Sequence, residues 1–190
     1  MKKIILPALT VLICALIIAV VPTEAEAAIY DDTVRLHIIA NSDGEEDQRL
    51  KLLLRDAVLE RYGQSLCAAK SKEDAEARLG NLLSDIEEYC EKTVRGLGYS
   101  YPVKATLTEE YYETRKYEEF TLPAGEYTSL RLVIGSGAGK NWWCVMYPPL
   151  CLGASVADDG IMNYSDGEKR LIRGGEYKVK FKLLELISQF

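Results

Sequence analysis

This sequence has little histidine, no clustered cysteines and no excess of positive charge. Histidine occurs once in 190 residues, as His37, so any Ser-His-Asp or Cys-His mechanism would have to use it. No C-x-x-C pair or His/Cys cluster is present, which argues against a zinc site. The formal net charge is -6, and a nucleic-acid binder would need a basic face. Internal repeats, low-complexity tracts and long linkers are also lacking.

The first 27 residues have the order of a secretory signal. Lys2 and Lys3 precede an apolar run over 4–21, and Ala25-Glu26-Ala27 then places small residues at the spacing that signal peptidase reads. The alternative is a retained anchor, because the run is nearly long enough to span a bilayer. We therefore divide the chain into a signal segment, 1–27, and a single exported signalling domain, 28–190. The acidic balance argues against adhesion to anionic lipid, so membrane contact is expected only through an uncleaved segment.

A strand and two amphipathic helices are predicted in the first half of this domain. Residues 33–40 (TVRLHIIA) are rich in β-branched side chains and predict a strand. Ser42 and Glu45 then fit a capping box that would begin a helix, with Gly63 as its natural stop. A second helix is expected from Ser71, with an apolar stripe from Ala75 to Leu97. The short connection makes the two helices antiparallel neighbours.

The second half alternates with a period of two, which indicates strands. Residues 103–108 form one, and 117–122 and 127–134 flank 123–126 as a hairpin with a longer loop. Residues 142–147 form another strand, which ends at Pro148-Pro149. We expect a loop over 158–175 and a strand that runs into a short helix over 177–190. The predicted fold is α+β, a mostly antiparallel sheet with an antiparallel helix pair packed on one face.

The cysteines suggest one disulfide. Four remain after the signal segment, an even number that favours disulfides in an exported domain. Cys144 and Cys151 are predicted to pair, since two prolines between them fold the chain back. Cys90 falls about 28 Å along the second helix, whereas the four residues from Cys67 to its start reach only about 14 Å. A disulfide needs Cα atoms within about 7 Å, so Cys67 and Cys90 are not expected to pair, and Cys90 should be a buried thiol.

Two loops imitate ligand-binding motifs without meeting their requirements. The stretch 135–140 (GSGAGK) resembles a phosphate loop, but Ile134 stands where the first glycine belongs and Asn141 where Ser or Thr should hold magnesium. We interpret it as a flexible loop. The acidic stretch 41–47 lacks both the D-x-D-x-D-G order and the twelfth-position glutamate of a calcium loop. Helix capping explains it better.

Candidate binding residues gather on two predicted strands. Alternation places His37 on the face of Arg35 and Ile39, as a structural or interface histidine; the alternative is a catalytic base with Cys144 as nucleophile. Alternation also sends Trp142 and Trp143 to opposite faces, so one of them could be exposed and anchor a partner. The candidate partner-binding residues are Trp142, Trp143, Tyr147 and His37. We predict no catalytic residue, metal or cofactor.

Three stretches carry a resemblance to a known family. RLHIIANSD over 35–43, Gly125-Glu126-Tyr127 and NWWCVMYPPLC over 141–151 resemble the stage II sporulation protein R family. The resemblance implies a protein made in the forespore and exported into the space between forespore and mother cell. There it would trigger a membrane-embedded aspartic protease of the mother cell, stage II sporulation protein GA, which cleaves the precursor of sigma factor E. The family has no established catalytic residues.

The leading hypothesis is therefore a secreted signalling ligand that activates a protease. The alternatives are an exported Cys/His hydrolase that acts on cell wall, through Cys144 and His37, and a structural protein of the septum.

Cleavage is expected after Ala27, which leaves Ala28 as the new N-terminus. Intact mass measurement of the exported protein checks this prediction. A membrane-bound species that still contains Lys2 would favour the retained anchor instead.

Overall fold

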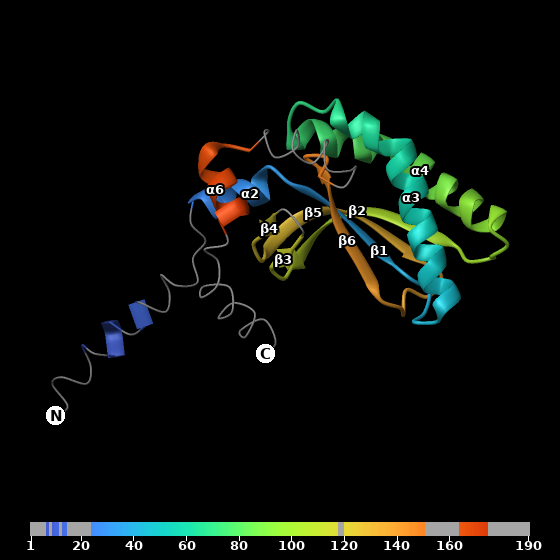
Figure 1. Ribbon diagram of the computed structural model, residues 1–190, viewed down its shortest axis with the longest axis horizontal. Helices are drawn as coiled ribbons and strands as arrows, with labels where there is room; N and C mark the ends of the chain where they lie inside the picture. Colours follow the sequence, from blue (N-terminus) through green and yellow to red (C-terminus); the bar gives the residue numbers. More distant parts are fainter. Residues whose placement is uncertain are drawn as a thin grey trace.

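The computed structural model describes residues 24–117, 120–150 and 164–174, together with positions 7, 9–11, 13 and 14 (Figure 1). The predicted strand and helix over 177–190 lie outside these residues, as does Cys151. The helices are α2 (Glu24–Asp31), α3 (Glu45–Cys67), α4 (Lys72–Gly96) and α6 (Asp166–Gly174). The strands are β1 (Val34–Ile39), β2 (Val103–Tyr112), β3 (Arg115–Lys116), β4 (Thr121–Leu122), β5 (Gly125–Ile134) and β6 (Asn141–Tyr147). Across the described ranges, no helix is both long and apolar enough to traverse a bilayer.

The sheet has four strands in the order β2-β5-β1-β6. Strand β5 pairs antiparallel with β2 and parallel with β1, and β6 pairs antiparallel with β1. The long helices α3 and α4 pack together and cover one face of this sheet, while β3 and β4 form a separate two-stranded sheet (Figure 1). The fold is thus α+β with a mixed, mostly antiparallel sheet and a helix pair on one face, as the sequence predicts.

The main core lies between the sheet and the two helices. Leu36 and Ile38 point toward the helices from β1, because alternate residues of a strand share a face. The stripe of α4 supplies Ala75, Leu79, Ile86, Cys90 and Val94, all fully buried. Cys90 is thus the buried thiol that the stripe predicts, and burial raises its pKa to about 12. Cys67, at the end of α3, is exposed, and both are free thiols.

The helix boundaries differ from the prediction at α3 and agree at α4. Helix α3 begins after Gly44, so Ser42 and Glu45 do not form a capping box; the Ser42 hydroxyl instead accepts from Gly44 N and donates to Asp47. Gly63 does not end α3, because burial of Tyr62 and Leu66 on either side of it carries the helix on to Cys67. At α4, Ser71 caps the helix by accepting from Asp74 N, as expected.

Two predictions in the second half are wrong. The expected hairpin across 123–126 does not form, because β4 pairs with β3 whereas β5 pairs with β1 and β2. Part of the expected loop over 158–175 is helix α6. Its start carries a capping box that the sequence analysis missed: Ser165 N donates to Glu168, and Glu168 N donates to the Ser165 hydroxyl.

Hydrogen bonds join the two motif-like loops, 41–47 and 135–140, to each other. Asn41 accepts from Ser136 N at 3.0 Å and donates to Asp47 at 2.8 Å, while Asp43 accepts from Lys140 N at 2.7 Å. These bonds fix the β1–α3 connection against the β5–β6 connection. The hydrogen bonds from Ser42 and Asn41 lower the pKa of the Asp47 carboxyl. The polar residues of 41–47 and the glycine-rich stretch 135–140 therefore serve a structural role, because each stretch holds the other in place.

Gly139 has no room for a side chain at this junction. A Cβ there would come within 2.2 Å of the Ser42 carbonyl oxygen, and this backbone atom cannot move away as the end of a flexible side chain could. We expect Gly139→Ala to lower the free energy of unfolding by about 1–3 kcal/mol. Urea denaturation of the purified domain measures it.

Gly80 provides the matched control for this substitution. It is exposed inside α4, and its Cβ would meet nothing within 4 Å. Gly80→Ala should therefore raise the stability by about 0.5–1 kcal/mol through helix propensity. Equal effects of the two substitutions would contradict the close contact at Gly139.

Candidate functional site

The sheet face away from α3 and α4 carries a group of polar and aromatic side chains. We call this group the Trp143 face and define it as Arg35, His37, Glu110, Tyr112, Arg115, Arg131, Asn141 and Trp143. Four strands of the main sheet and β3 contribute to it. The register explains the gathering, because His37 lies beside Arg131 on β5 and beside Trp143 on β6. Side chains of paired residues stand on the same face of a sheet.

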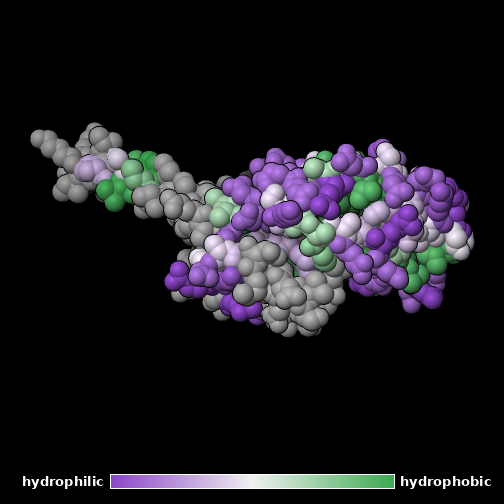
Figure 2. Space-filling model, turned by 90° about the horizontal axis from the view of Figure 1, so that it is seen from above, coloured by the Kyte–Doolittle hydropathy of each residue, from purple (hydrophilic) through white to green (hydrophobic). Residues whose placement is uncertain are grey.

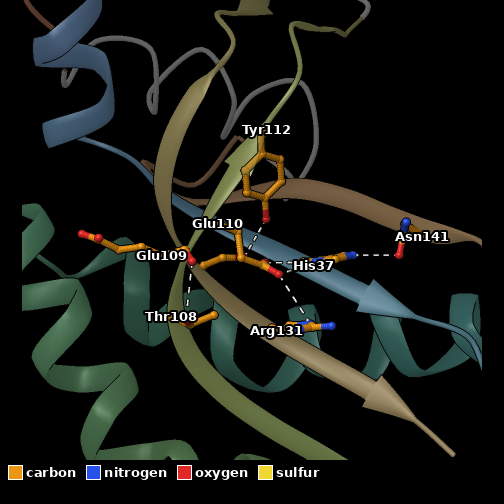
Figure 3. A network of polar contacts seen from close by, with 8 residues as sticks. His37, Thr108, Glu109, Glu110, Tyr112, Arg131 and Asn141 are labelled. Atoms are coloured by element: carbon orange, nitrogen blue, oxygen red, sulfur yellow. Dashed lines mark hydrogen bonds and ion pairs between the residues drawn. The ribbon is translucent and has the colours of Figure 1, made fainter. Parts of the chain in front are cut away.

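His37 stands at the centre of a polar chain across this face (Figure 3). Its Nδ1 lies 3.0 Å from a carboxylate oxygen of Glu110, and its Nε2 lies 2.9 Å from the Asn141 side-chain oxygen. Glu110 also meets Arg131, with the guanidinium Nε 3.5 Å from the carboxylate. The His37 side chain is 11% exposed and that of Glu110 is 18% exposed. His37 is thus held by partners on both ring nitrogens.

The charges around Glu110 keep it ionised. Partial burial alone would raise its pKa, but the hydrogen bond from His37 and the positive charges of His37 and Arg131 outweigh burial and lower the pKa below its ordinary value. Glu110 is therefore a structural carboxylate that holds His37 and Arg131. A general acid would instead need a raised pKa near neutrality.

The two tryptophans lie on opposite faces, as alternation predicts. Trp143 stacks on the His37 ring with centroids 5.5 Å apart, and the Arg115 guanidinium lies 3.8 Å from the Trp143 ring centroid. Trp142 packs against the helix-side core, with Arg55 of α3 at 5.1 Å. Each is half-buried, so neither matches a fully buried core residue or a fully exposed anchor. Tyr147 is 7% exposed and belongs to the helix-side core, which leaves its ring little surface for a partner.

Arg35 lies fully buried on the same face as His37. Its guanidinium packs 4.0 Å from the Tyr112 ring centroid and 5.0 Å from that of Tyr127, and it donates to the Tyr117 hydroxyl at 2.7 Å. Its Nε and Nη1 have no hydrogen-bond partner. The Gly125-Glu126-Tyr127 stretch thus supplies one wall of a cage for a buried cation.

The residues of the hydrolase alternative are not brought together. Cys144 pairs with Leu36 in the sheet register and shares its helix-side face, whereas His37 points to the opposite face. The sheet itself therefore separates the Cys144 sulfur from the His37 imidazole. Cys151 lies outside the described residues, so the disulfide between Cys144 and Cys151 stays a prediction. Among the described residues, no group of three or more His, Cys, Asp or Glu side chains is arranged to hold a metal ion.

Six residues of the Trp143 face were not among the predicted binding residues: Arg35, Glu110, Tyr112, Arg115, Arg131 and Asn141. Glu110 and Arg131 occupy alternating strand positions that are typical of a solvated face. Only the parallel pairing of β5 with β1 brings Arg131 beside His37. The strand alternation is the one signal that could have indicated their common face.

The fold and this face together define a two-layer α+β domain that presents a mixed aromatic and cationic surface on one side of its sheet. The family model of stage II sporulation protein R matches residues 30–157. Stage II sporulation protein R of Bacillus subtilis (strain 168) is 33% identical over 138 residues, which cover 73% of this chain and 58% of that relative. The chain belongs to the stage II sporulation protein R family. No solved structure matches it significantly.

The lowered pKa of Glu110 predicts a pH-dependent contribution to stability. Because the folded-state pKa lies below the unfolded one, the contribution is present above the unfolded value and is lost as pH falls through the folded value. We expect Glu110→Gln to lower the free energy of unfolding by about 1–2 kcal/mol at pH 7, and the difference from wild type to shrink below about pH 4.

Urea denaturation at several pH values measures this effect. Glu109→Gln is the matched control, since Glu109 is exposed on the same strand and should change the stability little. A Glu110→Gln effect that persists unchanged at acid pH would contradict the electrostatic explanation.

Proposed function

We propose that this chain is a secreted intercellular signal of sporulation that activates the membrane-embedded aspartic protease processing the sigma-E precursor. The observation that carries the proposal is the family match over residues 30–157, which includes β1, both long helices and all of β6. The export-type N-terminal segment supports it, because the protease would be reached from outside the forespore cytoplasm. The matched part spans 58% of the length of the Bacillus subtilis relative.

The signal acts by binding, without chemistry of its own. Cys144 and His37 point to opposite faces of the sheet, and the lowered pKa of Glu110 keeps the carboxylate that contacts His37 ionised. A ligand shifts its receptor only by its differential affinity for the active state. The chain therefore needs a surface that fits the active protease better than the inactive one. We assign that surface to the Trp143 face.

The helix-covered side is less suited to this role. Seen from above α3 and α4, its surface is mostly hydrophilic with small separate apolar patches (Figure 2). Leu52 and Leu53 of α3 are each about two-fifths exposed, and ion pairs there join residues within one helix, as in Arg78–Asp74, or between the two helices, as in Arg61–Asp85. A solvated helix surface of this kind is ordinary for a globular domain. The helix side also pairs Trp142 with Arg55, but the Trp143 face gathers Trp143 with three arginines, residue types that dominate binding energetics.

Reconstitution tests the proposed function directly. The purified domain 28–190 is added to vesicles that contain the protease and its sigma-factor precursor on the appropriate sides. We expect precursor cleavage that depends on the dose of the domain. Full cleavage without the domain, or none at any dose with an active protease, would contradict the proposal.

Trp143 should be the anchor of the interaction. We expect Trp143→Ala to remain folded and to need an about thirtyfold higher dose for half-maximal cleavage, the effect of losing an anchor worth about 2 kcal/mol. Trp142→Phe, which keeps an aromatic ring against the helix-side core, is the matched control and should act at the wild-type dose.

The hydrolase alternative predicts another pattern in the same assay. Folded Trp143→Ala would then act normally, whereas His37→Gln or Cys144→Ser would abolish cleavage. Circular dichroism of each variant separates loss of fold from loss of signalling.

A further inference from the structure

Guanidinium nitrogens without a hydrogen-bond partner concentrate on the Trp143 face, although Arg35 donates to Tyr117 through another nitrogen and Arg131 forms an ion pair with Glu110. Within the described residues, six buried side-chain nitrogen or oxygen atoms have no hydrogen-bond partner, and four of these six are arginine nitrogens. They belong to Arg35, Arg115 and Arg131, which all lie on this one face. Buried polar groups are normally paired, so several unpaired donors at one place need an explanation.

The local charge on this face is opposite to that of the whole chain. The Trp143 face includes three arginines, Arg35, Arg115 and Arg131. Among the described residues, Glu110 is the one carboxylate that contacts His37 or these arginines on this face. The chain as a whole carries a formal charge of -6. Burial raises the pKa of the Tyr117 hydroxyl, and the nearby charges of Arg35 and Arg115 oppose that rise, so both charges lie near the same hydroxyl. Guanidinium groups with incomplete hydrogen bonding therefore lie where positive charge exceeds negative charge in the part of the chain that the structure describes.

We infer that the Trp143 face binds an acidic segment of the partner protease, with carboxylates received by Arg115 and Arg131 beside the Trp143 ring. This inference rests on the proposed function and adds the chemistry of the partner. Arginine presents a planar fork that matches a carboxylate, and such charge-assisted bonds are stronger than neutral ones. The Arg131 side chain is 41% exposed and Arg115 is half-buried, so both are within reach of a partner. Arg35 is fully buried, so it cannot contact the partner, but its positive charge adds to the attraction of carboxylates to this face.

Variants of the two accessible arginines test the inference on the protease vesicles. We expect Arg115→Gln and Arg131→Gln each to raise the dose for half-maximal cleavage about tenfold or more, and the double variant to lose most of the salt dependence of binding. Arg55→Gln is the matched control, because Arg55 stacks on the other tryptophan at the helix side and should leave the dose unchanged. Wild-type dose for both variants, while the wild-type domain triggers cleavage, would overturn the inference.

A second measurement does not depend on the protease. A glutamate-rich peptide is titrated into the isotopically labelled domain 28–190, and the indole N–H resonances of both tryptophans are followed. We expect the Trp143 resonance to shift and the Trp142 resonance to stay, and Arg115→Gln/Arg131→Gln to abolish the shift. A peptide that moves neither resonance, or both equally, would overturn the inference even if wild-type signalling succeeds.

Protease-free vesicles of anionic lipid distinguish a membrane from a protein as the partner. Failure of wild-type cleavage with a specific peptide shift would reject the proposed function but retain the acidic-segment site. Binding to anionic vesicles that needs Arg115 and Arg131, and exceeds binding to protease in neutral vesicles, would overturn the inference in favour of a lipid surface.

Discussion

Strand β1 is buried along its whole length, and the alternation of its side chains decides what each face of the sheet can do. Leu36 and Ile38 turn toward α3 and α4 and form the centre of the main core. Arg35 and His37 turn the other way, where their polar groups must find partners. β1 lies between a parallel and an antiparallel neighbour, so a shift by one residue would exchange these two sets. The packing of Leu36 and Ile38 in the helix-side core therefore determines which side chains of β1 lie on the Trp143 face.

The same constraint explains why the conspicuous loops are structural. Asn41 and Ser42 follow β1 after Ala40, and their hydrogen bonds with Asp47 and Ser136 hold both α3 and the glycine-rich connection in place. Lys51 is pulled into this junction and donates to the Lys140 carbonyl at 2.9 Å, and its burial lowers its pKa. The loops thus set where β6 begins, and β6 in turn carries Trp143 onto its face.

Local pattern could be predicted from the sequence, whereas strand pairing could not. Alternation correctly placed His37 with Arg35 and separated Trp142 from Trp143, because a period of two is a property of the strand alone. The hairpin across 123–126 was wrong, since β5 pairs instead with strands distant in sequence. The prediction that Gly63 ends α3 was wrong, because the burial of Tyr62 and Leu66 outweighs the low helix propensity of glycine. Arg131 was missed because its importance comes entirely from its neighbours across the sheet.

We propose that binding to the protease covers the Trp143 face. Hydroxyl-radical footprinting of the domain, alone and bound to protease-containing vesicles, tests it most directly, since tryptophan and tyrosine oxidise readily where solvent reaches them. We expect binding to protect Trp143 and to leave the oxidation of Trp142 and of the exposed Tyr111 unchanged. Protection of Trp142 and the α3 surface, with Trp143 oxidised as in the free domain, would contradict it.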